Sequence, residues 1–292
     1  MLSNIVLGVL GLMTVWFCVA WLKGIKEEKS GAPTPHLIAV GFVTNFFDTL
    51  GIGSFAPTTA WYKGAKLVQD RIIPGTLNVG HTLPVVVMSF IFIQRVEVEP
   101  LTLTLMLVAA VAGAFLGADV VSGLSERKVQ FGMGIALFIT AIFMLLGMFN
   151  LMPSGGEAVG LSGTKLVIAV AVNFILGALM TLGIGLYAPC MALIYALGMS
   201  PLVAFPIMMG SCAYLMPTAS VKFIKNKAFD KKAALGLAIG GVPAVFVAAY
   251  LVTSLPMAVL RWLVVAVILY TAVTMLKSGM ESARKEETVW EA

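Results

Sequence analysis

The chain has 292 residues, of which 60% are hydrophobic and 11% charged, and its formal net charge is +5. A soluble domain carries about a quarter charged residues, so this composition excludes a protein whose whole surface faces water. Apolar stretches of about 20 residues recur along the chain, the length that a helix needs to cross a ~30 Å hydrocarbon core. The sequence therefore predicts an all-α polytopic membrane protein. Because its positive charge lies in short connections, we assign that charge to topology and lipid contact and expect no nucleic-acid binding.

In chain order the hydropathy pattern predicts about nine transmembrane helices. The first has no lysine or arginine before its apolar run and no clear cleavage site, so we interpret it as a span and not as a removed signal peptide. The predicted spans are 3–22, 37–60, 77–93, 101–122, 129–152, 166–187, 201–221, 233–254 and 257–276.

The basic residues predict the orientation of these spans. The odd-numbered connections and the C-terminal tail hold 13 of the 19 lysine and arginine residues, and the even-numbered connections hold 6. Since cytoplasmic connections carry the excess of positive charge, the N-terminus is predicted outside and the tail 277–292 in the cytoplasm. The connection 61–78 then places three positive charges on the outer side, so we interpret it as a loop or as an interfacial or re-entrant segment.

One nine-residue motif occurs twice in the sequence. "TLGIGSFAP" (49–57) and "TLGIGLYAP" (181–189) agree at seven of nine positions, and a similar shift also aligns Gly80 with Gly210. The sequence therefore predicts two four-helix repeats, 37–152 and 166–276, after an extra N-terminal helix and loop, 1–36. With four spans each, the repeats would enter the membrane from the same side. An uncounted re-entrant hairpin would invert that relation.

Each phrase is predicted to break a helix. Glycine lowers helix propensity, and the proline that follows each Gly-Ile-Gly run removes an amide donor. Within lipid, freed amides need a partner in protein, water or ligand, and the positive end of the helix after the break favours an anion. Matched breaks are typical of secondary transporters, whose sites lie near the midplane between repeats. The alternative is a kink with close packing of small residues.

The candidate substrate-binding residues are polar, glycine or cysteine residues on or near these breaks. In the first repeat they are Asn45, Asp48, Thr49, Gly51, Gly53, Ser54, Thr58, Thr59 and His81. In the second repeat they are Thr181, Gly183, Gly185, Tyr187, Cys190, Ser211 and Cys212.

Two of these residues are also candidates for proton coupling. Asp48 lies near the middle of an apolar stretch, where an acid costs about 2.5–3.5 kcal/mol on insertion scales and marks a partner, a cavity or a proton path. Its counterpart in the second repeat is Met180. His81 titrates near neutrality, so it is suited to pass a proton or contact an anion. The alternatives are a hydrogen-bonded helix contact for Asp48 and a place among lipid headgroups for His81.

The sequence favours neither metal binding nor catalysis. Cys18, Cys190 and Cys212 lie in separate apolar segments without a C-x-x-C pair, so no disulfide and no zinc site are predicted. Cys190 and Cys212 are interpreted either as inert apolar side chains or as contacts to a sulfur-containing substrate. Because the chain has two histidines and no H-E-x-x-H, nucleophile elbow or P-loop, we predict no catalytic residue and no cofactor.

The run from Ala192 to Leu276 resembles the sulfite-exporter permeases of the TauE/SafE type, a family of bacterial and archaeal transporters. The matching features are the Gly-x-Gly phrase, "GMSP" (198–201), the basic hairpin with Asp230, and "SLPMAVLRWL" (254–263). The resemblance implies a duplicated four-helix fold that moves sulfite, thiosulfate, sulfonates or related organic anions across the cytoplasmic membrane. The family often has three consecutive glycines at the broken helix, whereas Ser54 follows Gly53 here, which predicts a narrower pocket.

The functional hypothesis is a secondary transporter for a small sulfur-containing anion, surrounded by membrane lipids, with protons as the candidate coupling ion. The alternatives are an anion channel, or a membrane-embedded enzyme or assembly factor without transport activity.

Overall fold

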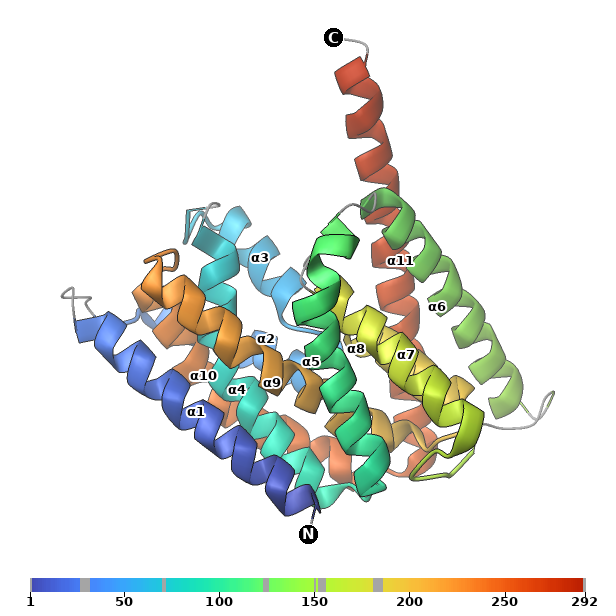
Figure 1. The fold of residues 1–292 in the computed structure, drawn as a ribbon. Coiled ribbons are helices and arrows are strands. Elements are labelled where there is room, and N and C mark those ends of the chain that lie inside the picture. The colour runs from blue at the N-terminus through green and yellow to red at the C-terminus, as the bar shows by residue number, and fades with distance from the viewer. Residues whose placement is uncertain are drawn as a thin grey trace. The chain divides into compact units, whose positions relative to one another are not determined.

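The computed structural model describes residues 2–26, 32–69, 72–122, 126–149, 151, 156–180 and 186–290, and this part of the chain forms helices without a strand. The all-α class is thereby confirmed. The helices are α1 (Leu2–Lys26), α2 (Pro35–Thr49), α3 (Phe55–Gly64), α4 (Ile73–Arg95), α5 (Pro100–Ser122), α6 (Glu126–Met148), α7 (Gly163–Met180), α8 (Tyr187–Ala196), η2 (Pro201–Val203), α9 (Ala204–Lys225), α10 (Lys231–Ser254) and α11 (Met257–Trp290) (Figure 1).

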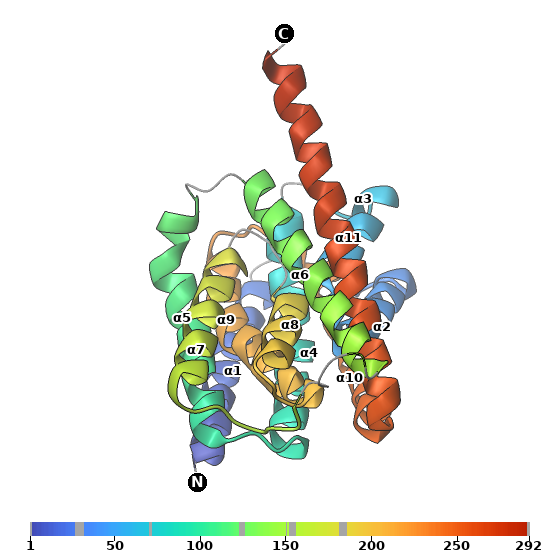
Figure 2. The ribbon, with the colours of Figure 1, turned by 90° about the vertical axis from the view of Figure 1, so that its right-hand side faces the viewer.

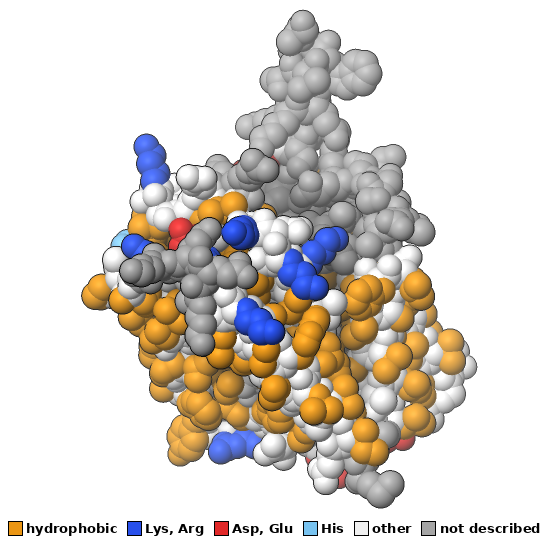
Figure 3. All heavy atoms as spheres, turned by 60° about the vertical axis from the view of Figure 1, so that its left-hand side comes forward, with side chains coloured by type: hydrophobic (Ala, Val, Ile, Leu, Met, Phe, Trp, Pro, Cys, Tyr) orange, Lys and Arg blue, Asp and Glu red, His pale blue; other side chains and the backbone are white. Residues whose placement is uncertain are grey.

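Several helices have the length and apolar composition needed to cross a membrane. Among the described residues, six helical stretches are long and apolar enough: Ser3–Gly24, Ile73–Arg95, Gly163–Met180, Pro201–Lys225, Lys231–Ser254 and Arg261–Glu281. Parts of α5, α6 and α8 are shorter apolar helices. Hydrophobic side chains cover much of the face shown in Figure 3. The chain is therefore a multi-pass membrane protein, although the predicted count of nine spans is not confirmed.

The chain forms two compact units. Unit 1 comprises Met1–Leu107 and Phe205–Leu255, and unit 2 comprises Val108–Ala204 and Pro256–Ala292. Unit 1 holds α1 to α4, nearly all of α9, and α10, whereas unit 2 holds α6 to α8, η2 and α11 (Figures 1 and 2). Each unit thus combines helices from both predicted repeats, and the repeat boundaries themselves stay a prediction.

Glycines bring helix backbones into contact within each unit. In unit 1, a Cβ atom at Gly240 of α10 would lie 2.0 Å from the carbonyl oxygen of Ile38 in α2. In unit 2, a Cβ atom at Gly113 of α5 would lie 1.8 Å from the carbonyl oxygen of Phe174 in α7. Small residues at helix contacts are typical of membrane proteins, because they let backbones approach closely.

The first glycine phrase ends α2 as predicted. The Gly51 N–H donates to the Asp48 carbonyl oxygen at 2.8 Å, and the Ile52 N–H donates to the Phe47 carbonyl oxygen at 3.1 Å. With Gly51 at a φ of 95°, this is a Schellman motif, which needs a left-handed residue just after the helix. Gly53, with a φ of 90°, turns the chain again before α3. In the second phrase, residues 181–185, which include Gly183 and Gly185, lie outside the described residues, and Tyr187 to Pro189 begin α8.

After this turn, α3 runs back toward the start of α2. The Trp61 Nε1–H donates to His36 Nε2 at 3.1 Å, and Tyr62 packs in one cluster with Leu37 and Val40. A continuous helix would place residues 36 and 61 about 37 Å apart at 1.5 Å per residue. The interpretation of 37–60 as one crossing is therefore wrong, because two left-handed glycines reverse the chain. We call residues 35–64 hairpin 1.

The second repeat contains a comparable hairpin. Lys165 Nζ, near the start of α7, donates to the carbonyl oxygen of Leu197, which directly follows α8, at 3.0 Å. The Ser200 N–H donates to the Ala158 carbonyl oxygen at 2.9 Å, so the chain before α7 pairs with the chain after α8. The predicted span 166–187 therefore covers α7 and the beginning of a helix that returns. We call residues 163–196 hairpin 2.

Hairpin 1 also corrects the placement of connection 61–78. The orientation argument put this connection and the lysine-rich connection 222–232 on opposite sides of the membrane. In the structure the Asp230 N–H donates to Thr76 Oγ1 at 2.8 Å, and Lys231 Nζ donates to the Gly24 carbonyl oxygen at 2.6 Å. The end of α1, the start of α4 and the α9–α10 connection therefore lie at one end of unit 1.

Candidate functional site

Hairpin 1 and α4 enclose a group of buried polar side chains inside unit 1. The predicted residues in this group are each at most 3% exposed: Asn45, Asp48, Thr49, Ser54, Thr58 and His81. A buried polar group is costly unless it is hydrogen-bonded, so the bonding pattern of this group decides what it can do.

His81 of α4 is held by both arms of hairpin 1. Its Nδ1 lies 3.0 Å from Asn45 Oδ1 on α2, and its Nε2 lies 3.1 Å from Thr58 Oγ1 on α3. Asn45 Nδ2 donates to the Gly41 carbonyl oxygen at 2.7 Å, which turns the amide oxygen toward the histidine. Since that oxygen only accepts, Nδ1 carries a proton.

The Thr58 hydroxyl has two possible acceptors. Its oxygen lies 2.7 Å from the Ser54 carbonyl oxygen, which also accepts the Thr58 N–H at 3.0 Å. When the hydroxyl donates to Ser54, Nε2 of His81 must donate, and the ring is an imidazolium. When the hydroxyl donates to Nε2, the ring is neutral. Rotation of one hydroxyl thus keeps the network bonded in both protonation states of His81.

Asp48 closes the other end of the network. Its carboxylate is hydrogen-bonded to the side chain and to the backbone of Ser54, the N-cap residue of α3. The second carboxylate oxygen, Oδ2, is buried without a hydrogen-bond partner. Ser54, at the N-terminal end of α3, therefore contacts both ends of the group: it is hydrogen-bonded to Asp48, and its carbonyl oxygen accepts the Thr58 hydroxyl that lies beside His81.

The remaining predicted residues are distributed over both units. In unit 1, Thr59 is half-buried on α3, while Ser211 and Cys212 are buried on α9, where Ser211 Oγ donates to the Ile207 carbonyl oxygen at 2.8 Å. In unit 2, Tyr187 and Cys190 are buried on α8. Thr181, Gly183 and Gly185 lie outside the described residues. The three cysteines are free thiols.

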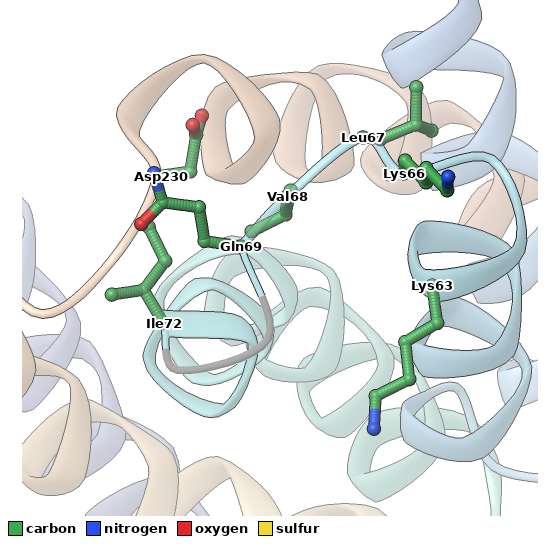
Figure 4. Close-up of a pocket in the computed structure, with 7 residues that line it drawn as sticks. All are labelled: Lys63, Lys66, Leu67, Val68, Gln69, Ile72 and Asp230. Carbon is green, nitrogen blue, oxygen red and sulfur yellow. The ribbon is translucent and has the colours of Figure 1, made fainter.

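The sequence analysis missed a polar cavity at the open end of hairpin 1. This cavity of about 500 Å³ is lined by Lys63, Lys66, Leu67, Val68, Gln69, Ile72 and Asp230. Figure 4 shows Asp230 and Gln69 on one side of the cavity and the two lysines on the other. In the sequence, the only indication of this cavity was the unexpected positive charge of connection 61–78. The return of α3 brings that charge close to Asp230.

Thr58→Val is expected to destabilise the protein, because it removes the hydroxyl that pairs with His81 Nε2 while it conserves side-chain volume. A buried group left unsatisfied costs about 1–3 kcal/mol. The measurement is the melting temperature of the purified protein. Thr59→Val, at the half-buried neighbouring position on α3, is the matched control. Equal melting temperatures of the two variants would contradict the network.

The fold and this site are typical of one class of protein, the polytopic helical membrane transporters, in which helices broken within the bilayer surround ionisable residues. Residues 165–291 match the family model described as sulfite exporter TauE/SafE. The predicted resemblance is thereby confirmed for this part of the chain, and it indicates a membrane transporter. No curated protein and no solved structure matches the chain.

Proposed function

We propose that the protein is a secondary transporter that moves a small sulfur-containing anion, such as sulfite, thiosulfate or a sulfonate, across the cytoplasmic membrane. The observation that carries the proposal is a helix, α3, that starts inside the buried part of unit 1 beside ionisable residues. The N-terminal end of a helix binds anions through bare amides and its dipole. The family match supports a sulfur oxyanion as cargo.

In this proposal the residues of hairpin 1 bind the anion. Ser54, Thr58 and Thr59 supply hydroxyl donors, and the turn with Gly51 and Gly53 lets an anion approach the backbone. The candidate binding residues of the second predicted repeat stay part of the proposal: Thr181, Gly183, Gly185, Tyr187, Cys190, Ser211 and Cys212.

Protons are the proposed coupling ion, with Asp48 and His81 as their carriers. An inside-negative membrane potential favours the exit of a monovalent anion by about 2.3 kcal/mol per 100 mV, so export needs no coupling. Uptake against the potential needs a cation. His81 keeps its hydrogen bonds in both of its protonation states, so it is suited to bind and release a proton close to Asp48.

The two hairpins support an orientation for the chain. If both return to the side from which they enter, each repeat crosses the membrane three times and α1 adds one crossing. Of the 19 basic residues, 16 then lie on one side, and only Arg95, Lys165 and Arg261 lie on the other. The richer side is cytoplasmic, so the N-terminus is outside and the C-terminus inside. An odd number of crossings per repeat makes the repeats inverted.

Site-specific labelling tests this orientation. In a variant without native cysteines, a single cysteine at Ala65 or at Lys225 is expected to react with an impermeant maleimide only from the cytoplasmic side. Thr164→Cys should react only from outside. All three positions are exposed. Reaction of the cysteines at positions 65 and 225 from opposite sides would contradict the return of hairpin 1.

Flux measurements test the function. Purified protein in liposomes is expected to move sulfite, thiosulfate or a sulfonate with saturation and counterflow, and a pH gradient is expected to drive accumulation. Flux without saturation or counterflow would indicate a channel. No flux of any of these anions under either condition would contradict the proposed function.

A further inference from the structure

We propose that the Asp48 carboxylate is an internal anion that occupies the site at the start of α3, and that the transported anion replaces it only when Asp48 is protonated. This inference rests on the proposed function, because it states how the same site is regulated. It makes the proton and the anion bind together and not in exchange.

Asp48 already holds the position that an anion would take. Helix α3 has no capping bond from the side chain of its N-cap residue, Ser54. That side chain is bonded to Asp48 instead, and so is the Ser54 backbone. A carboxylate bonded to the backbone at a helix start gains a charge-assisted hydrogen bond and a favourable dipole interaction, which are the interactions that bind free anions. Asp48 therefore interacts with the start of α3 as an anion would, without any ligand.

The unpaired oxygen of Asp48 points to a second state. Asp48 is 2% exposed, and its Oδ2 has no hydrogen-bond partner. An ionised carboxylate has only acceptors, so it repels an anion at this oxygen. Once Oδ2 carries a proton, it is a donor, and the oxygen of a sulfur oxyanion is a suitable acceptor. Protonation thus changes Asp48 from a competitor into a ligand.

The turn after Asp48 argues against a metal cation as the occupant of this place. The carbonyl oxygens of Phe46, Phe47 and Asp48 at the end of α2 accept amide hydrogens from the turn. The end of α2 therefore presents a single carboxylate and no open ring of carbonyl oxygens, whereas Na⁺ sites at broken helices use unwound carbonyls. A proton needs only the one oxygen.

His81 is the titratable side chain in the same hydrogen-bonded group, and it lies on α4. The other charged or titratable groups on the helices packed around Asp48 lie at or near helix ends or on the exposed surface. Arg95 ends α4, and Lys231 and Lys232 begin α10. Tyr62 and Lys63 lie in the last turn of α3, and His36 lies in the first turn of α2. Tyr250 on α10 is 69% exposed. His81 is therefore the one other titratable side chain buried among the described residues of this hydrogen-bonded group.

The test compares thiosulfate binding to the full-length wild type and to Asp48→Asn between pH 5 and pH 8, a range in which thiosulfate stays a dianion. The wild type is expected to lose affinity by up to about tenfold per pH unit as Asp48 ionises. Asp48→Asn, which imitates the protonated acid, is expected to bind at least tenfold more tightly than the wild type at pH 8, without this pH dependence. Asp230→Asn is the matched control, because Asp230 is also a carboxylate bonded to the backbone at a helix start: it accepts the Ala233 N–H of α10.

The possible results are distinguishable. If Asp48→Asn binds thiosulfate with the wild-type pH dependence, the inference is overturned while the proposed function stands. If neither protein binds or transports any of the named anions, the proposed function fails as well. Should Asp48→Asn not fold, proton uptake by the wild type on thiosulfate addition in weak buffer replaces it. Close to one proton per bound anion supports the inference, and no uptake overturns it.

Discussion

Gly240→Ala is expected to prevent normal packing of α10 on α2. The new Cβ atom would lie 2.0 Å from the carbonyl oxygen of Ile38 and 2.7 Å from the amide nitrogen of Phe42. Both are backbone atoms, so no side chain can rotate away and α2 itself must move. Overpacking of this kind costs about 1–3 kcal/mol and occasionally more. Because α2 carries Asn45 and Asp48, the variant is expected to lose transport together with stability.

The matched control is Gly8→Ala on α1. A Cβ atom there has no heavy atom within 4 Å, and the position is helical, as Gly240 is. Both variants gain the same helix propensity, roughly 1 kcal/mol for glycine to alanine, so their difference isolates the helix contact. Melting temperature and size-exclusion profile in detergent measure it. If Gly240→Ala melts at or above the temperature of Gly8→Ala, the described contact between α2 and α10 is wrong.

The second large effect is expected for Gly51→Val. Residue 51 has a φ of 95°, and a left-handed conformation costs roughly 1–2 kcal/mol for an L-residue and more for a β-branched one. Valine at this position favours an α2 that continues through the turn. That change would separate Trp61 from His36 and move Ser54 away from Asp48. We expect anion flux to fall at least tenfold, which corresponds to about 1.4 kcal/mol.

Gly64→Val separates this effect from a general intolerance of hairpin 1 to valine. Gly64 ends α3, has no positive φ, and a Cβ atom there meets no heavy atom within 4 Å. The flux of Gly64→Val should stay near that of the wild type. Wild-type flux and stability in Gly51→Val would show that the left-handed turn is not needed.

The candidate site was only partly predictable from the sequence. Asp48 and His81 were identified because ionisable residues in apolar segments are costly, and the structure places both in one hydrogen-bonded group. The partners within that group were not predictable. Whether Thr58 faces His81 depends on the direction and rotation of α3, which no local pattern specifies. The cavity between Lys66 and Asp230 was missed for the same reason, since Asp230 lies more than 150 positions from the other lining residues, which fall within 63–72.

Composition and local backbone preference by themselves determined that this protein is helical, that it belongs in a membrane, and that α2 ends just before Gly51. These properties depend on residues within a few positions of one another, and glycine tolerates a left-handed turn wherever it occurs. Only the tertiary structure decided that α3 returns to His36 and that each compact unit combines helices from both predicted repeats. The physical reason is that a turn permits the next helix to leave in many directions. Contacts between residues distant in the chain, such as that of Gly240 with Ile38, select one of these directions.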